Sequence, residues 1–199
     1  MLDNKVLVFD FDGTLTTRDT LIAFIRFARG TAWLVWCLLL LLPRLVLMKM
    51  GLVDNGLTKQ RLFAMCFKGM ATADFDDQCR RFAATIGWSV RRQETWDVME
   101  RALAEGGAVY VVSASVDNWV SPFFPEPVTV VGTRVESVDG RLTGRFLTPN
   151  CYGAEKVRRL KEVLPALDSN RAHYYIIAYG DSRGDKEMLA YADESHYVG

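Results

Sequence analysis

The sequence predicts an α/β protein with a Rossmann-like parallel sheet, an inserted helical region and a small β-hairpin. Short apolar strands alternate with helical segments, which is typical of a parallel sheet. The first strand, Lys5–Phe9, is followed directly by Asp10 and Asp12. In open α/β sheets, ligands bind at the edge where such a strand ends. Asp139-Gly140, between two further short strands, is a strong hairpin signal.

The composition indicates a globular protein with a sizeable core. The 199 residues suit one domain, or one core with an insertion, and half of them are hydrophobic. Lysine and arginine total 24, as do aspartate and glutamate, so the chain lacks the net positive charge of nucleic-acid-binding proteins. The four cysteines are scattered without a CxxC pair, which indicates neither a zinc site nor a disulfide framework. Because no secretory signal pattern stands at the start, we expect a cytoplasmic protein.

Helical patterns occupy the chain between the first strand and the second. Apolar periodicity and end signals predict helices over Asp19–Arg29, Asn55–Lys68, Thr72–Gly87 and Arg91–Ala104. Thr72 is expected to cap the third of these helices. Residues 17–88 are therefore expected to form a helical insertion, and residues 1–16 and 89–199 to form the core.

An unusual apolar run lies inside this insertion. Residues 32–42 are all apolar, and the pattern resumes over Leu45–Met48 after Pro43 and Arg44. A membrane-spanning helix needs about 20 apolar residues. The polar residues at the strand ends lie both before and after this run in the sequence, and we expect them to form one site on one side of any membrane. A single crossing would separate them, and no second apolar run is present that could cross back. A full membrane span is therefore not expected. Three explanations remain: a buried helix pair, peripheral membrane contact through residues 32–50, or a homodimer interface.

The second half of the chain alternates between strands and helices. The predicted strands are Ala108–Val112, Val128–Val131, Thr133–Ser137, Arg141–Phe146, His173–Ala178 and Ser195–Val198. The predicted helices are Asp117–Phe124, Gly153–Leu164 and Gly184–Tyr191. Pro165 is expected to end the second of these helices, and Ser113 to end the first strand.

Four stretches, in order, resemble the motifs of the haloacid dehalogenase (HAD) superfamily of phosphohydrolases. They are DFDGTLT at residues 10–16, VVSAS at 111–115, GAEKV at 153–157 and GDSRGD at 180–185. The chain looks most like the phosphoserine-phosphatase-like branch, subfamily IB. This resemblance implies a HAD fold in which the insertion is a helical cap over the catalytic edge of the sheet.

Asp10 is the candidate nucleophile, and Asp12 is the candidate general acid and base. Hydrolysis of a phosphate ester needs groups that neutralise the negative charge of the ester, a nucleophile aligned with phosphorus, and a proton for the leaving oxygen. A carboxylate can attack phosphorus to give an aspartyl-phosphate, which divides one difficult step into two. The second carboxylate then protonates the leaving alcohol and later activates water. The resemblance assigns the same two roles.

Asp181 is the candidate second carboxylate on a metal ion. Clustered carboxylates without a nearby histidine or cysteine suit a hard ion, which indicates Mg²⁺. The predicted ligands are Asp10, Asp181 and, as the resemblance implies, the backbone carbonyl of Asp12. Asp185, four residues after Asp181, is expected to hold Asp181, a metal-bound water or Lys156.

Ser113 and Lys156 are the candidate phosphate-binding residues. The Ser113 hydroxyl and the N–H groups that follow it, beginning with Ala114, are expected to bind phosphoryl oxygens. Lys156 lies in the first turn of a helix, where positive charge is unfavourable, and such local conflicts are common in functional residues. Substrate or supporting contacts are further expected from Gly13, Thr14 and Ser182, which belong to the motifs.

The motifs predict the reaction rather than the substrate. Phosphoserine phosphatases grip the amino acid with an acidic residue and a cap arginine, for which Asp19 and Arg61 are the candidates here. The apolar run is instead similar in composition to the cap of phosphatidylglycerophosphatase C, from the same branch. The expected substrate is therefore a small phosphorylated metabolite, such as phosphoserine, or a lipid phosphate. A phosphotransferase or phosphomutase, and a non-catalytic membrane or protein interaction module, are the alternatives.

Overall fold

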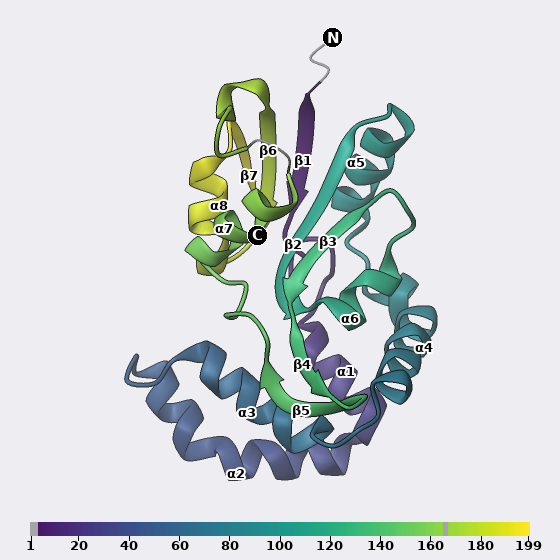
Figure 1. Cartoon of the computed structure of the whole chain (residues 1–199), viewed down its shortest axis with the longest axis vertical. Helices are drawn as coiled ribbons and strands as arrows, with labels where there is room; N and C mark the ends of the chain where they lie inside the picture. The colour runs from purple at the N-terminus through teal and green to yellow at the C-terminus, as the bar shows by residue number, and fades with distance from the viewer. Residues whose placement is uncertain (1–3, 165–166) are drawn as a thin grey trace.

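The computed structural model describes residues 4–164 and 167–199. Its main sheet has five strands, all parallel, in the order β3-β2-β1-β6-β7 (Figure 1). The strands are β1 (Lys5–Phe9), β2 (Ala108–Val116), β3 (Thr129–Thr133), β6 (Tyr175–Gly180) and β7 (Glu194–Tyr197). The predicted α/β fold with a parallel sheet is confirmed, whereas Pro165 lies outside the described residues.

The central strand β1 separates two hydrophobic cores. Leu7 and Phe9 point into one core, and Val6 and Val8 into the other, because successive side chains of a strand face opposite sides. Helix α5 (Gln93–Ala104) covers the first face, and helices α7 (Ala154–Val163) and α8 (Lys186–Tyr191) cover the second (Figure 1). A strand buried on both sides needs an unbroken apolar sequence, which Lys5–Phe9 supplies after its first residue.

The strand order reverses at β1, and this reversal places the functional edge. β2 pairs with one side of β1 and β6 with the other. Their carboxyl ends therefore open a crevice at the point where open α/β sheets bind ligands. Asp10 directly follows β1, Asp181 directly follows β6, and β2 carries Ser113 near this edge.

Four of the five helices between β1 and β2 gather at one end of the molecule, and the fifth, α5, covers the sheet. The four are α1 (Thr20–Arg29), α2 (Thr31–Lys49), α3 (Asn55–Phe67) and α4 (Thr72–Val90), and α2 lies farthest from the sheet in Figure 1. The predicted hairpin, β4 (Val135–Val138) and β5 (Arg141–Phe146), packs against α3 rather than against the main sheet. Backbone hydrogen bonds join Leu142 of the hairpin to Gly69 and Met70, which follow α3. The division into a core and a cap at residues 17–88 stays a prediction.

Four local features differ from the sequence-based expectations. Ser113 lies inside β2, which continues to Val116 through an irregularity in its pairing with β3. Thr72 is the first residue of α4 and not its cap, because the cap position is Ala71. The apolar run forms one helix, α2, which continues through Pro43, and not a buried helix pair. His173 ends a short 3₁₀ turn, Arg171–His173, that precedes β6.

Further 3₁₀ turns complete the fold. Helix α6 (Asp117–Val120) continues into the turn Ser121–Phe123, and the turn Arg183–Asp185 leads into α8. All four cysteines are buried and free in this structure.

The loop after β1 is held from one side by the start of α5. The Thr95 hydroxyl donates to the Thr14 carbonyl at 2.7 Å, and the Trp96 indole N–H donates to the Leu15 carbonyl at 2.7 Å. The Arg92 guanidinium donates to the Gly13 carbonyl at 3.1 Å. These bonds satisfy carbonyls that turn away from the sheet, so they fix the loop that carries the first motif.

Replacing Thr95 with valine tests this anchoring. Thr95→Val keeps the shape of the side chain but leaves the buried Thr14 carbonyl without its 2.7 Å donor. We expect the free energy of unfolding, measured by urea denaturation, to fall by about 1–3 kcal/mol. Thr85→Val is the matched control, because Thr85 is exposed and bonds only within its own helix. It should cost less than about 0.5 kcal/mol, and equal losses for both variants would refute the anchoring role.

Candidate active site

A buried lysine lies between two buried aspartates at the carboxyl edge of the sheet. Nζ of Lys156 is 2.5 Å from Oδ1 of Asp10 and 2.5 Å from Oδ1 of Asp185. Lys156 reaches this position because α7 starts beside the sheet edge, after Gly153 adopts a left-handed φ of 62°. The ammonium compensates two carboxylates that would otherwise be buried without an opposite charge. The geometry thus brings together residues that the sequence separates by 146 positions.

Opposite effects set the pKa values of this cluster. Burial raises the pKa of Asp10 to about 7, even though the charge of Lys156 acts to lower it. Burial would also raise the pKa of Asp185, but Lys156 and Ser182 hold it below the ordinary value. Burial acts to lower the pKa of Lys156, but the two carboxylates raise it overall, so the lysine stays positively charged.

Asp12 turns toward the helical end of the site. Its carboxylate accepts hydrogen bonds from the backbone N–H of Thr20 at 2.7 Å and from the hydroxyl of Ser115 at 2.5 Å. Burial, followed by the negative charge of Asp19, raises the pKa of Asp12 despite these bonds. A raised pKa favours the protonated carboxyl, which is the form that a general acid needs.

Asp181 approaches the first motif closely because residue 13 is glycine. Gly13 has a left-handed φ of 91°, and a Cβ at this position would lie 2.2 Å from Oδ2 of Asp181. The Thr14 hydroxyl donates to Oδ1 of Asp181 at 2.9 Å. Among the described residues, Oδ2 of Asp181 accepts no hydrogen bond, so it is available to another ligand. This arrangement explains why the sequence places Gly13 and Thr14 together after the two aspartates.

Carboxylate oxygens of Asp10, Asp181 and Asp185 lie within 4.8 Å of one another. Three oxygen donors so close together suit Mg²⁺, which prefers oxygen ligands, so the residues present fit the predicted ion. The side chain of Asp12 lies outside this cluster, against Thr20 and Ser115. The contribution of its backbone carbonyl to a metal site stays a prediction.

The other predicted residues line or support the same site. The Ser113 hydroxyl is buried and accepts the N–H of Ser115 at 3.0 Å, while the Ala114 carbonyl faces the cavity side of β2. Ser182 caps the 3₁₀ turn before α8 and donates to Oδ2 of Asp185 at 2.8 Å. Its role is therefore to orient Asp185.

Asp19 and Arg61 differ in their positions. Asp19 caps α1 by accepting the N–H of Leu21 at 2.9 Å, and it also lines the catalytic cavity. Arg61 does not line this cavity, but borders a separate surface hollow with Arg44 and Lys68. Arg61 therefore borders a different hollow from the candidate catalytic residues, and its contact with a substrate stays a prediction.

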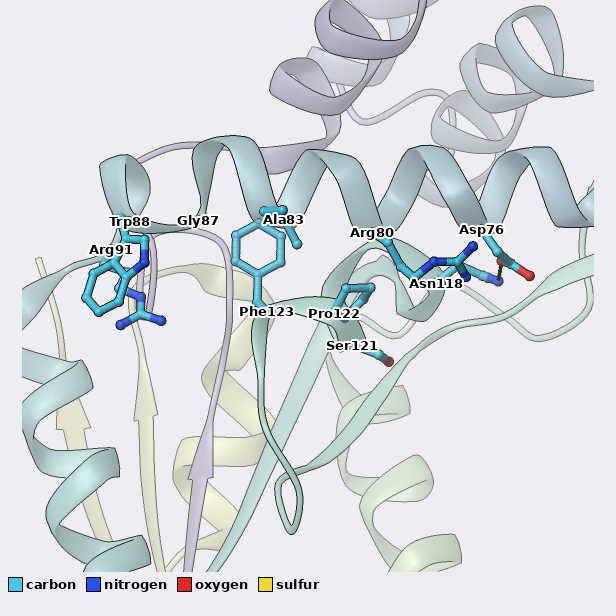
Figure 2. Close-up of a pocket in the computed structure, with 11 residues that line it drawn as sticks. Asp76, Arg80, Ala83, Gly87, Trp88, Arg91, Asn118, Ser121, Pro122 and Phe123 are labelled. Carbon is cyan, nitrogen blue, oxygen red and sulfur yellow. Dashed lines mark hydrogen bonds between the residues drawn. The ribbon is translucent and has the colours of Figure 1, made fainter.

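The cavity that Asp10 and Asp12 line has a volume of about 320 Å³ and combines charged residues on one side with an apolar wall. Its polar lining includes Asp10, Asp12, Ser113, Lys156, Asp185, Asn150 and Tyr152. Its apolar lining comes mainly from α2, through Leu38, Leu41, Leu45 and Met48, with Leu21, Ile22 and Leu62 beside them. A larger and shallower hollow lies elsewhere, between α4 and the turn after α6 (Figure 2). Asp76 and Asn118 bond to each other there, and none of the predicted catalytic residues lines it.

Lys59 is a cavity residue that sequence reasoning missed. Its ammonium donates to the Ala114 carbonyl at 2.8 Å, so it connects α3 to β2. Burial lowers the pKa of Lys59, while the charges of Asp12 and Asp19 oppose that change. The available signal was weak: a lysine on the side of α3 that also carries the buried residues Thr58 and Leu62. Ser115, whose role the motif left open, bonds directly to Asp12.

Comparisons with known proteins find a family and several similar chains. A family model described as haloacid dehalogenase-like hydrolase matches residues 7–190. Protein CicA of Caulobacter vibrioides is 35% identical over 195 residues, which cover 96% of this chain and 85% of CicA.

Two solved structures share the fold at lower identity. A protein of unknown function from Bordetella pertussis Tohama I is 19% identical, with a TM-score of 0.80 over 96% of this chain and 88% of that chain. A phosphoserine phosphatase, solved as a phospho-aspartyl intermediate analogue, is 17% identical, with a TM-score of 0.59 over 96% of this chain and 85% of that chain.

Replacing Lys156 with methionine tests the charge balance of the site. The variant leaves Asp10 and Asp185 buried without the ammonium between them, so the free energy of unfolding at pH 7 should fall by about 3–5 kcal/mol. Removing the positive charge raises the folded-state pKa of Asp10 further, and it raises the pKa of Asp185, which Lys156 holds low in the wild type. The loss should therefore be smaller at pH 5 than at pH 8, because protonation relieves the repulsion.

Guanidinium denaturation in the presence of EDTA measures this effect. Lys161→Met is the control, because Lys161 lies on the same helix and its Nζ is 2.7 Å from Asp168 at the surface. Such a pair contributes about 0–1 kcal/mol. A Lys156→Met protein no less stable than the control would contradict the buried pairing.

Proposed function

The chain belongs to the haloacid dehalogenase-like hydrolase family, and we propose that it is a phosphatase that hydrolyses phosphate monoesters through Asp10. The observation that carries this proposal is the position of Asp10, buried beside Lys156 at the end of the central strand and open to the cavity. Asp12 lines the same cavity two residues on. This arrangement offers a nucleophile, a neighbouring acid and a fixed positive charge in one place.

In the first step, a carboxylate oxygen of Asp10 attacks phosphorus, and the bond between phosphorus and the ester oxygen breaks. The carboxyl of Asp12 gives its proton to the departing oxygen, which leaves as an alcohol. In the second step, Asp12 takes a proton from water as the water oxygen attacks the aspartyl-phosphate. Inorganic phosphate leaves, and Asp10 returns to its carboxylate form.

Positive groups of the chain lower the cost of bringing an anionic ester to an anionic nucleophile. Lys156 holds the Asp10 carboxylate and adds charge beside the phosphoryl group. The hydroxyl of Ser113 is expected to contact a phosphoryl oxygen. Lys59 supplies a second ammonium at the opposite side of the cavity, near Asp12.

Mg²⁺ is the proposed cofactor. Asp10, Asp181 and the Asp12 carbonyl would hold it, and Asp185 would orient Asp181 through its bond to the Asp181 N–H at 3.3 Å. When bound, the ion supplies positive charge that neutralises phosphoryl oxygens and aligns them.

The proposed substrate is a small phosphate ester, either a soluble metabolite or a lipid phosphate. The cavity volume of about 320 Å³ suits a small molecule, and its lining carries both charged and apolar groups. We propose a cytoplasmic location, with peripheral membrane contact or homodimer formation through residues 32–50 as the two ways in which the apolar run could be covered.

Replacing Asp10 tests the nucleophile. Asp10→Asn removes the attacking carboxylate while nearly preserving shape, so kcat for hydrolysis of p-nitrophenyl phosphate should fall by at least about 10³-fold. Phosphate release is the measurement, and circular dichroism checks that the fold persists. Asp77→Asn, an exposed substitution on α4, should keep wild-type activity.

Turnover of Asp10→Asn near the wild-type rate would reject the nucleophile. Transfer of phosphate to an added alcohol, in place of release to water, would instead favour a phosphotransferase. No turnover by the wild type would favour a binding module.

The metal site is tested with Asp181→Asn. Loss of one negative oxygen donor should raise the Mg²⁺ concentration for half-maximal activity by about tenfold or more, since even indirect metal contacts contribute about 10–100-fold. EDTA should abolish activity in the wild type. Asp139→Asn, in the hairpin turn where asparagine is tolerated, should leave the Mg²⁺ requirement unchanged. An equal Mg²⁺ requirement for Asp181→Asn would remove Asp181 from the metal site.

A further inference from the structure

Helix α2 is apolar on all sides, but only its inner side is covered. Among the described residues, it is the one helix whose length and composition would suit a membrane span, with a mean hydropathy of 2.0 over an 18-residue window within residues 31–49. Leu34, Cys37 and Leu41 are its buried residues. Exposed apolar side chains cover the rest of the helix: Trp33, Val35, Trp36, Leu39, Leu40, Leu42, Val46 and Leu47. We call this set the outer face.

The inner side of α2 forms a wall of the catalytic cavity. Leu38, Leu41, Leu45 and Met48 recur every three or four positions, so they form one stripe along the helix. They border the same cavity as Asp10 and Asp12. A substrate whose phosphate reaches Asp10 therefore meets hydrocarbon on the α2 side. For a soluble, fully polar ester this wall offers no hydrogen-bonding group.

The segment that contains the outer face is positively charged. Residues 20–53 contain no aspartate or glutamate, and contain the basic residues Arg26, Arg29, Arg44 and Lys49. None of these four forms an ion pair with a described residue. Such a segment suits a surface of anionic headgroups around an apolar interior, where the basic side chains meet phosphates and the tryptophans lie at the interface.

The fold keeps α2 on one side of a bilayer. α1 and α3 both pack against it, and its buried residues belong to the same core as the first strand. The chain before and after α2 therefore returns to a single body, which suits a helix that lies in the plane of the interface.

We propose that the inner side of α2 holds the apolar chain of an amphiphilic phosphate monoester, while its outer face rests on an anionic lipid surface. The proposal rests on the phosphatase function and names the substrate class of that site. One helix then contacts the bilayer and the substrate at once. A lipid chain would leave the membrane and enter the cavity with little exposure to water, because apolar surface is present on both sides of α2.

The first experiment uses soluble alkyl phosphates, from ethyl to octyl, with Mg²⁺. Their reacting groups are alike, so a rise in kcat/KM reports burial of the chain. We expect kcat/KM to rise by roughly threefold per methylene until the cavity is filled, and by at least about tenfold between ethyl and octyl phosphate. Leu45→Gln, on the inner side, should reduce this octyl-to-ethyl ratio at least fivefold; Met48→Gln serves if the first variant unfolds.

The second experiment measures flotation with vesicles that contain phosphatidylglycerol, compared with vesicles of phosphatidylcholine alone. The wild type and Leu45→Gln should float with the anionic vesicles. The outer-face variant Leu39→Gln with Leu40→Gln should stay behind, because side chains 59% and 54% exposed lose their contact with lipid. It should keep the octyl-to-ethyl ratio of the wild type.

The outcomes separate the two proposals. No phosphate release from any alkyl phosphate or from p-nitrophenyl phosphate would reject the phosphatase function. Release with no dependence on chain length, or a ratio that Leu45→Gln leaves unchanged, would reject the amphiphilic substrate alone. Absence of binding to anionic vesicles, or a homodimer that the outer-face variant dissociates, would overturn the lipid surface as the partner.

Discussion

The ion pairs of Lys156 with Asp10 and Asp185 are the constraint on which the site depends. Three charged groups inside a protein are tolerable only when they neutralise one another within hydrogen-bonding distance. The carboxyl ends of β1 and β6 and the first turn of α7 must therefore lie close together. The backbone is shaped to permit this: a Cβ on Gly180 would lie 2.5 Å from the Cβ of Asp185. The glycine lets the last motif fold back under the lysine.

The same charge cluster explains the asymmetry between the two candidate catalytic aspartates. Asp10 points toward Lys156, whose charge opposes the rise in pKa that burial causes, and Asp12 points toward neutral donors on α1 and β2. Burial raises the pKa of both residues, but a charged partner opposes the rise at Asp10 and mainly neutral donors oppose it at Asp12. A phosphatase needs this difference, because one carboxylate must attack while the other carries a proton.

The strands and the motif residues could be predicted from the sequence because each depends on a short local pattern. The apolar run before Asp10 predicts β1 correctly to the residue, and the order of the motifs brings Lys156 to Asp10. The pattern could not predict the orientation of α2, since a helix that is apolar on every side has no periodicity to show which side is buried. Lys59 was missed for a related reason: its role depends on the packing of α3 against β2.

The packing of the β4–β5 hairpin against α3 limits how the helices can move relative to the sheet. An insertion placed between β1 and β2 would be joined to the sheet by two stretches of chain, around Thr17 and Arg91, which lie side by side. The hairpin adds two more, one between β3 and β4 and one between β5 and α7. A rigid-body swing of the helices away from the sheet would have to bend all four stretches together. We therefore expect substrate entry and product release to need only small displacements of side chains along α2, and not a wide hinge motion of the helices.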